Sequence, residues 1–477
     1  MSDIVHGFAD DAMGCLDAVA IAERIRVGEV SAEEVTEAAI ARAEHVNPRL
    51  NGFAHTAFQS ARDQSARCGA GPFAGVPVVI KDNVDVSGMP TCYGSRAFDP
   101  HPAKRTAAPA GQVAEQGYIV LGKSTMPEWG LTASTEYADR PPTRNPWNTG
   151  RSAGASSGGS AALVASGVVP VAHANDGGGS IRIPAAVNGL VGLKPTRDRL
   201  LNQPGANQLP INIAAEGVVT RTVRDTAHHL AALERPRPSR HLPPIGLVEG
   251  PGTTRLRIGV ITETPAGEVD PEMIVTVHAA AALLAGLGHE ITVDVAMPVD
   301  RRFVTDFARY WGFFAVALTA SSKLTKPGAF HPTRLDPFTR ALFRDSLSQV
   351  QHWPGAIVRL RRDAAQAEKI SERFDVVLSP VLCHPAPELG YLNPGLPFRE
   401  FFDRTIAYGG FTALNNVGGT PAISLPFGML DNGLPGSIHL AAATGNERTL
   451  LELAYEIEAA QPFPQIGNPA ATKEELQ

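Results

Sequence analysis

The 477-residue sequence has few cysteines, few aromatic residues and no excess of charge of one sign. Its four cysteines, at positions 15, 68, 92 and 383, form no C-x-x-C pair, which argues against zinc or dithiol chemistry and against a disulfide framework. We interpret them as free thiols, with Cys383 as a small buried side chain. Lys and Arg number 42 against 48 Asp and Glu, so we expect no basic surface for nucleic acid.

Long apolar runs are also missing. A membrane span needs roughly 18 consecutive apolar residues, and the most apolar stretch, residues 161–174, is interrupted by serine, glycine, proline and histidine. The first ten residues lack the basic and then apolar order of a signal peptide. We therefore expect a cytoplasmic protein that does not engage a membrane.

What is present is the composition of a large globular chain, 43% hydrophobic and 19% charged. Apolar runs at 75–80, 118–121 and 168–174 predict buried strands that alternate with helical patterns, which favours a layered α/β fold with a large sheet. Ser31 and Glu34 form a capping box at the start of one predicted helix. Beyond a proline-rich connector at 235–252, residues 256–295 predict a βαβ-like unit.

The region 301–324 is expected to be a helix and carries six aromatic residues. Aromatic side chains at helical spacing most often pack in a core, but ligand pockets are also lined by them. Both interpretations stay open, and core packing is the commoner outcome.

Residues 117–124 (GYIVLGKS) match the phosphate-binding pattern G-x-x-x-x-G-K-[ST]. That motif needs a strand before the first glycine and a helix after the serine, which presents its N-terminus to phosphate. Here the residues between the glycines are themselves the predicted strand, and Pro127 follows Ser124 closely. We therefore regard the match, with Lys123, as accidental.

Residues 154–158 (GASSG) satisfy the G-x-S-x-G nucleophile elbow. An elbow serine sits where a buried strand turns into a helix, whereas the residues before this one form a polar loop that contains proline and glycine. The context therefore disfavours Ser156 as an elbow nucleophile.

Residues 176–184 (DGGGSIRIP) follow a predicted strand almost directly. Three consecutive glycines let the backbone turn sharply and direct several N–H groups into one small volume, as an oxyanion site requires. Donors of this kind beside a serine hydroxyl suit acyl transfer. A flexible turn in which Ser180 caps a helix is an equally good interpretation of these residues alone.

Taken together, several segments resemble the amidase signature family. They are, in order, 75–82 (GVPVVIKD), 154–160 (GASSGGS), 176–184 (DGGGSIRIP), 189–196 (GLVGLKPT), 217–225 (GVVTRTVRD) and 416–422 (NVGGTPA). The interval of 24 residues between Ser156 and Ser180 matches the interval between that family's two catalytic serines. The resemblance runs from about residue 16 to residue 462, and the region 235–375 contributes no motif.

The resemblance implies one large domain with a mixed, twisted sheet covered by helices on both faces. Its expected regions are a helical 1–70, a signature core at 71–235, a variable region at 236–374 packed on that core, and a C-terminal part of the same core at 375–477. It also implies a hydrolase that cleaves a small-molecule amide without metal or cofactor. A homodimer is compatible with it, and nothing in the sequence fixes the oligomeric state.

By similarity, Ser180 is the expected nucleophile, Ser156 a bridging serine that follows a cis peptide bond, and Lys81 the base. The backbone N–H groups of Gly177, Gly178 and Gly179 would form the oxyanion hole. Ser157 and Asp176 would orient the reacting groups through hydrogen bonds, and Arg182 would anchor the loop by pairing with a carboxylate. A local role of these three residues in turns and caps is an equally good interpretation. A lysine accepts a proton only when neutral, so burial must lower its pKa, and the apolar run 76–80 is consistent with burial. The commoner fate of a lysine is the surface, here beside Asp82.

Two positions depart from the usual family pattern. Ala155 stands where glycine is common, next to the expected cis bond, and Ala174 and Asn175 stand where Gly-Thr commonly precedes the aspartate. A role that depends on the threonine hydroxyl is therefore in doubt, although Asn175 still donates and accepts hydrogen bonds.

An alternative function within the same family is the glutaminase subunit of a tRNA-dependent amidotransferase, which would need partner subunits.

Overall fold

A computed structural model describes residues 4–237 and 239–467, so the ends of the expected regions 1–70 and 375–477 lie outside it. Eleven strands form one sheet in the order β1-β3-β2-β6-β8-β7-β12-β13-β11-β9-β10, and β4 and β5 form a separate ribbon. The sheet is mixed, with parallel pairs such as β2 with β3 and antiparallel pairs such as β6 with β8. The strands are β1 (Phe53–Thr56), β2 (Pro77–Lys81), β3 (Ile119–Ser124), β4 (Arg144–Asn145), β5 (Asn148–Ser152), β6 (Val171–Asp176), β7 (Val191–Lys194), β8 (Ala215–Thr220), β9 (Arg257–Val260), β10 (Glu290–Thr292), β11 (Val376–Ser379), β12 (Ala422–Met429) and β13 (Pro435–Ala442).

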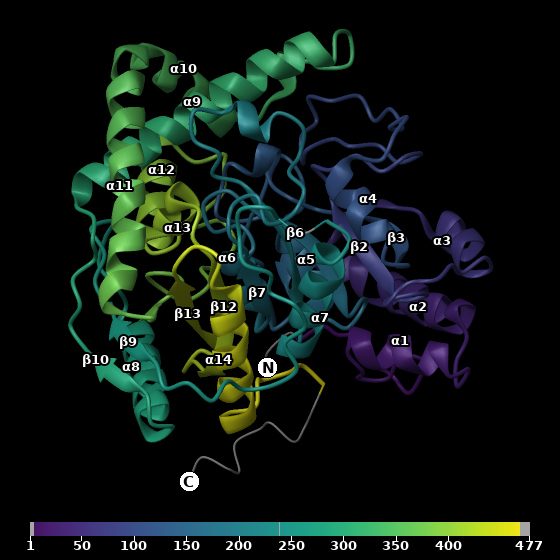
Figure 1. Ribbon diagram of the computed structural model, residues 1–477. Helices are drawn as coiled ribbons and strands as arrows, with labels where there is room; N and C mark the ends of the chain where they lie inside the picture. Colours follow the sequence, from purple (N-terminus) through teal and green to yellow (C-terminus); the bar gives the residue numbers. More distant parts are fainter. Residues whose placement is uncertain (1–3, 238, 468–477) are drawn as a thin grey trace.

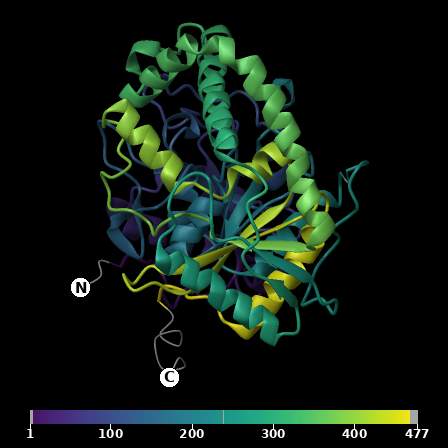
Figure 2. The same cartoon turned by 90° about the vertical axis from the view of Figure 1, so that its left-hand side faces the viewer.

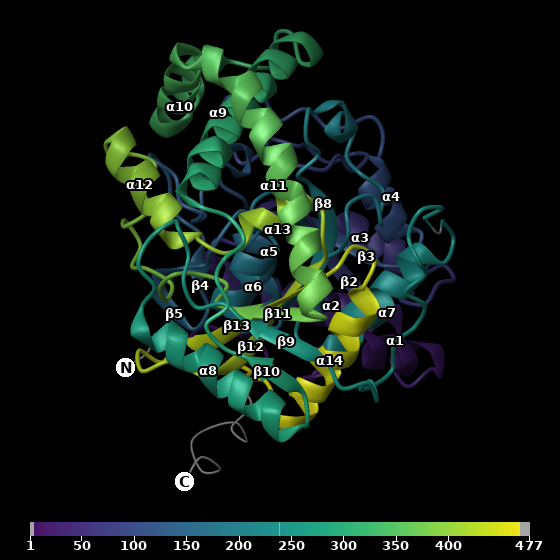
Figure 3. The same cartoon turned by 60° about the vertical axis from the view of Figure 1, so that its left-hand side comes forward.

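Helices cover both faces of this sheet, as predicted. Figure 3 shows α5 and α6 on one side of β11, β12 and β13, and α8 and α14 on the other. Figures 1 and 2 show the long helices α9 and α11 grouped with α10 and α12, away from the N-terminal helices. The helices are α1 (Ala18–Arg26), α2 (Ala32–Leu50), α3 (Phe58–Ser65), α4 (Ala108–Ala114), α5 (Gly158–Ala165), α6 (Arg182–Asn188), α7 (Val223–Glu234), α8 (Pro271–Gly286), α9 (Arg301–Thr325), α10 (Pro337–Ser348), α11 (Trp353–Arg373), α12 (Phe398–Tyr408), α13 (Ala413–Gly418) and α14 (Glu447–Ala460).

Local sequence signals account for several of these elements. The predicted capping box is present, with the Ser31 hydroxyl accepting from the Glu34 N–H and the Glu34 carboxylate accepting from the Ser31 N–H. The predicted βαβ unit is β9, α8 and β10, with the two strands parallel. The described residues of the proline-rich connector 235–252 contain no helix or strand, because proline can donate no backbone hydrogen bond.

Three strands lie at the two ends of the sheet, in regions that contribute no family motif. The strand β1 lies within the region 1–70 and pairs with β3 at one edge of the sheet. At the opposite end of the sheet, β9 and β10 come from the region 236–374. This region therefore extends the sheet as well as packing against it.

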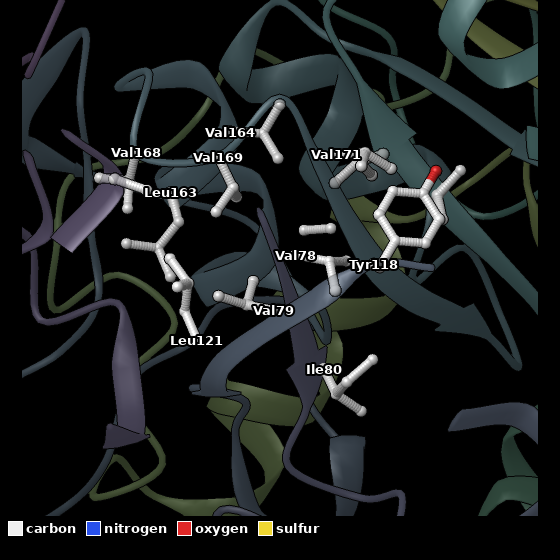
Figure 4. Packing of buried hydrophobic residues seen from close by; sticks show 14 of the residues in the cluster. Val78, Val79, Ile80, Tyr118, Leu121, Leu163, Val164, Val168, Val169 and Val171 are labelled. Carbon is white, nitrogen blue, oxygen red and sulfur yellow. The ribbon is translucent and has the colours of Figure 1, made fainter. Parts of the chain in front are cut away.

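The strand β2 lies deep in the molecule, and all five of its residues are buried. Figure 4 shows Val78, Val79 and Ile80 among apolar side chains of β3, α5 and β6. Burial of an aliphatic side chain contributes about 1.5–3 kcal/mol to stability. The strand that ends at Lys81 is therefore firmly anchored in the core.

Candidate active site

Three of the segments that resemble the family meet where neighbouring strands end. The strands β2 and β6 are parallel and paired, with Val78 opposite Val171 and Val79 opposite Ala172. Their carboxyl ends therefore lie at the same edge, which is where α/β sheets place ligand sites. This pairing brings Lys81, the last residue of β2, beside Asn175 and Asp176, the last two residues of β6.

Lys81 is fully buried and in contact with a serine hydroxyl. Its Nζ lies 2.7 Å from Ser156 Oγ, 2.7 Å from Asn175 Oδ1 and 3.3 Å from the Asn175 carbonyl oxygen. Burial lowers the pKa of this lysine, the charges of Glu216 and Asp176 raise it, and the net result is a pKa of about 7. A large fraction of Lys81 is therefore neutral near neutral pH.

Burial alone does not single out Lys81. Lys194, in β7, is equally buried, and its pKa is also lowered to about 7, by burial and by the positive charge of Arg182. Its Nζ, however, donates to the carbonyl oxygen of Pro195. The contact with a hydroxyl that borders a cavity distinguishes Lys81 from this second buried lysine.

Ser156 follows a cis peptide bond, Ala155–Ser156, at the position expected from the family resemblance. The next residue, Ser157, donates from its hydroxyl to the carbonyl oxygen of Ser180 at 2.6 Å. This bond ties the segment that bears Ser156 to the segment that bears Ser180. Ser156 and Ser180 line the same cavity, although no hydrogen bond joins their hydroxyls within the described chain.

The loop that carries Ser180 is held by a buried carboxylate. Asp176 accepts from the N–H groups of Gly179 at 2.7 Å and Ile181 at 3.1 Å, and pairs with the Arg182 guanidinium at 3.0 Å. Burial raises the pKa of Asp176, but the positive charge of Arg182 outweighs it, and the net pKa lies below the usual range. The predicted pairing of Arg182 with a carboxylate is therefore present.

Gly179 was predicted to donate its N–H to the oxyanion, but this N–H makes a hydrogen bond within the protein. Its N–H is committed to Asp176 Oδ1, so it is not free to bind an oxyanion. The N–H groups of Gly177 and Gly178, in contrast, make no hydrogen bond within the described residues. Gly179 shapes the loop instead: its φ of 132° suits glycine, and a Cβ there would lie 2.5 Å from Thr412 Oγ1.

Two cavities meet at Ser180. One, of about 890 Å³, is mainly apolar and includes Leu131, Ile183, Met297 and Phe307 in its wall. The other, of about 1430 Å³, borders Ser156 and has a more polar wall that includes Asn83, Asn175, Gln203 and Glu216. A bound molecule at Ser180 therefore has an apolar space on one side and hydrogen-bonding groups on the other.

Some aromatic residues of α9 pack in the core and others line a cavity, so both interpretations of this segment apply. Tyr310 is buried and donates its hydroxyl to the carbonyl oxygen of Ile211. Phe307 and Trp311 line the apolar cavity, and Trp311 also borders the second, more polar one, together with Phe313 and Phe314. The helix therefore packs on the domain through some of its rings and forms cavity wall with others.

The two accidental motif matches are explained by the fold. Lys123 lies inside β3, fully buried, and its Nζ is 3.5 Å from Asp82 and 3.0 Å from Thr91 Oγ1. A loop that wraps phosphate is therefore absent from this described segment. Ser156 does not stand on a strand-to-helix elbow either, because β5 ends at Ser152 and belongs to the separate ribbon.

Several site residues were not identified from the sequence. The Asn416 side chain donates to Asp176 Oδ1 at 2.8 Å and accepts from Arg182 at 2.6 Å. It begins the segment 416–422, which was noted without assigning a role. The Glu216 carboxylate accepts hydrogen bonds from the side-chain amides of Gln203 and Asn175. The sequence around it did not indicate this role, because Glu216 lies just before the family segment 217–225.

The described residues contain no group of three or more His, Cys, Asp or Glu side chains placed to hold a metal ion. None of their helices is both long and apolar enough to cross a bilayer.

Comparison with known proteins identifies the family of the chain. The family model named Amidase matches residues 34–451. The AmiC protein of Mycobacterium tuberculosis is 47% identical over 468 residues, which cover 98% of each chain. The 6-aminohexanoate-cyclic-dimer hydrolase of Paenarthrobacter ureafaciens is 36% identical, with 95% of this chain and 97% of that one covered.

Solved structures show the same relationship. A 6-aminohexanoate cyclic dimer hydrolase in complex with its substrate superposes with a TM-score of 0.85 at 33% identity, covering 94% of this chain and 97% of that one. A bacterial aryl acylamidase of the amidase signature family gives a TM-score of 0.83 at 26% identity, over 94% and 96% of the chains. Sequence, fold and site thus lead to one assignment, and the chain belongs to the amidase signature family of amide hydrolases.

Proposed function

We propose that this enzyme cleaves its amide substrate through an acyl-enzyme on Ser180, with Lys81 as the base and Ser156 as the bridge. The observation that carries the proposal is the buried Lys81 Nζ, with a pKa of about 7, at 2.7 Å from Ser156 Oγ. Neutral Lys81 accepts the Ser156 proton, Ser156 accepts the Ser180 proton, and Ser180 Oγ attacks the carbonyl carbon. The same relay returns a proton to the departing amine, and water then hydrolyses the ester.

The step from Ser180 to Ser156 requires their hydroxyls to come into contact. Catalytic hydrogen bonds are often long in free enzymes and shorten in the substrate complex. Ser180 Oγ has no hydrogen-bond partner among the described residues, and the residue borders both cavities, so its hydroxyl is available for this movement.

The oxyanion of the tetrahedral intermediate would be bound by the free N–H groups of Gly177 and Gly178. Removal of one oxyanion donor in comparable enzymes costs about 3–4 kcal/mol of transition-state stabilisation. Asp176 supports this site indirectly: it holds the N–H groups of Gly179 and Ile181 and so fixes the curvature of the loop.

The substrate that fits best is a small amide with an apolar acyl group. The apolar cavity beside Ser180 is lined by Phe307, Trp311 and Met297, which suit an aliphatic chain or an aryl ring. The relatives named as hydrolases of the 6-aminohexanoate cyclic dimer act on an amide with aliphatic segments, which agrees with this choice. The second cavity, whose wall also carries Asn83, Gln203 and Glu216, would then receive the amine side of the substrate.

A panel of amides tests this proposal. It contains acetamide, hexanamide, a benzamide, a secondary hexanoyl amide and glutamine, scored for acid and amine release by the isolated chain. We expect hexanoyl and aryl amides to be cleaved faster than acetamide, and Ser180→Ala to abolish each activity. Glutamine hydrolysis that requires a second protein chain would instead support the amidotransferase subunit.

The pH dependence supplies a second test. Lys81 must be neutral to act, so kcat/KM should rise with pH through about 7 and level off above it. Activity that falls over this range would contradict a lysine base.

A further inference from the structure

The neutral Lys81 side chain has two N–H groups to donate and one lone pair to accept a proton. Three oxygen atoms surround its Nζ: Ser156 Oγ at 2.7 Å, Asn175 Oδ1 at 2.7 Å and the Asn175 carbonyl oxygen at 3.3 Å. If both N–H groups donate to the two oxygens of Asn175, the lone pair is left for Ser156. A lysine without this arrangement would offer Ser156 an N–H as readily as its lone pair.

The orientation of the Asn175 amide is fixed by a carboxylate. Glu216 Oε2 lies 3.4 Å from Asn175 Nδ2, and an ionised carboxylate only accepts hydrogen bonds, so it selects the amide rotamer that directs Nδ2 toward it. The oxygen Oδ1 must then face Lys81. Asn83 adds a reciprocal pair, with Asn175 Nδ2 donating to Asn83 Oδ1 at 3.0 Å and Asn83 Nδ2 donating to Asn175 Oδ1 at 3.2 Å.

Glu216 is itself firmly held. Its Oε2 lies 2.9 Å from His173 Nε2, and its Oε1 accepts from Gln203 Nε2 at 3.0 Å. His173 is on β6, and its Nδ1 lies 3.4 Å from the backbone N of Lys81. Three neighbouring strands, β2, β6 and β8, thus contribute to one hydrogen-bonded network around the lysine.

We propose that Asn175 is a positioning residue for the lysine base: its side-chain and backbone oxygens hold both N–H groups of neutral Lys81 and direct the lone pair at Ser156 Oγ, while Glu216 sets the orientation of the amide. This inference rests on the proposed function of Lys81. It assigns a role to the position where the chain carries asparagine in place of the threonine common in the family.

The charged groups near the lysine fix the expected pH effects. Glu216 on β8 and Asp176 on β6 both raise the pKa of Lys81 against the larger effect of burial, and His173 faces Glu216. Asn175→Leu removes an acceptor that stabilises the charged form, so the acidic limb of the kcat profile should move to lower pH. Asn175→Asp adds a negative charge, so the limb should move to higher pH by roughly one unit or more.

The experiment measures kcat and KM across pH for Asn175→Leu, Asn175→Asp and Glu216→Gln. We expect Asn175→Leu to lower kcat by about 10²-fold, as a misdirected reacting group does, with little change in KM. Asn432→Asp is the charge control, because Asn432 is exposed in the turn between β12 and β13, and its profile should match that of the wild type.

Shifts of the acidic limb in opposite directions for Asn175→Leu and Asn175→Asp would support the inference, whereas equal shifts or none would overturn it. If a position 175 variant does not fold, as judged by its melting temperature, Glu216→Gln decides the matter. It should lower kcat and move the limb to lower pH, because a negative charge is lost and the Asn175 amide is free to flip. An unchanged profile for Glu216→Gln would refute the network.

Parallel assays of Lys81→Met and Ser180→Ala separate the two levels of the argument. If either variant keeps full activity, the proposed function itself fails. If both are inactive while folded Asn175→Leu behaves like the wild type, only the role of Asn175 fails.

Discussion

Replacing Lys81 with methionine should change the way in which stability depends on pH. Methionine is unbranched, apolar and close to lysine in length, so it fits the buried position without a titrating group. In the unfolded chain Lys81 has its ordinary pKa of 10.5, and in the folded protein its pKa is about 7. Between these values the unfolded chain binds a proton that the folded protein does not.

The sign and size of the effect follow from proton linkage. Because the unfolded state binds more protons in this window, the free energy of unfolding rises with pH, by at most about 1.4 kcal/mol per pH unit for one group. Between pH 7 and pH 9 the wild type should therefore gain about 2 kcal/mol of stability relative to Lys81→Met. The absolute stabilities also depend on the packing of methionine, so the slope of the difference is the informative quantity.

Urea unfolding of both proteins at pH 7, 8 and 9 measures this slope. Lys194→Met should change the slope in the same direction, because the pKa of Lys194 is also about 7, but it should retain turnover. Lys323→Met, at an exposed position of α9, should change neither stability slope nor turnover. A constant stability difference between wild type and Lys81→Met across this range would refute a buried, easily deprotonated lysine.

Three further substitutions test other parts of the site. Ser180→Ala should reduce kcat to background while substrate binding, measured by calorimetry, persists; formation of an acyl-enzyme by this variant would contradict the assignment. Arg182→Met should lower the free energy of unfolding by about 3–5 kcal/mol, because it leaves the buried Asp176 without its ion pair, and a melting temperature equal to the wild-type value would oppose this account. Phe307→Ala should lower kcat/KM for hexanamide by about tenfold but spare acetamide, and an equal loss for both amides would show that Phe307 does not contact the acyl chain.

Much of the fold was predictable because its signals are local. Alternating strands and helices, the capping box at Ser31 and the βαβ unit at β9, α8 and β10 depend on residues close in sequence. The pairing of β1 with β3 was not predictable in this way. It joins Phe53 to Ser124, far apart in the chain, and its four residues show no clear alternation.

In the site, too, local sequence motifs were predictive and contacts between distant segments were not. The sequence motifs pointed to Lys81, Ser156 and Ser180, and the structure places Lys81 against Ser156 and both serines around one cavity. The engagement of the Gly179 N–H by Asp176 could not be read from three identical glycines, because it depends on the curvature of the loop. The part played by Glu216 depends on the pairing of β6 with β8, which sequence patterns do not specify.

The clamp of Asn416 and Thr412 on the loop that bears Ser180 has a consequence for the timing of assembly on the ribosome. Arg182 donates to the carbonyl oxygen of Thr412 and to Asn416, and Thr412 donates to the carbonyl oxygen of Gly178. The nucleophile loop therefore gains these two supports more than 200 residues after it has been synthesised, in addition to those from Asp176 and Ser157. Nascent chains and fragments that end before this point would carry all three proposed catalytic side chains and yet remain inactive.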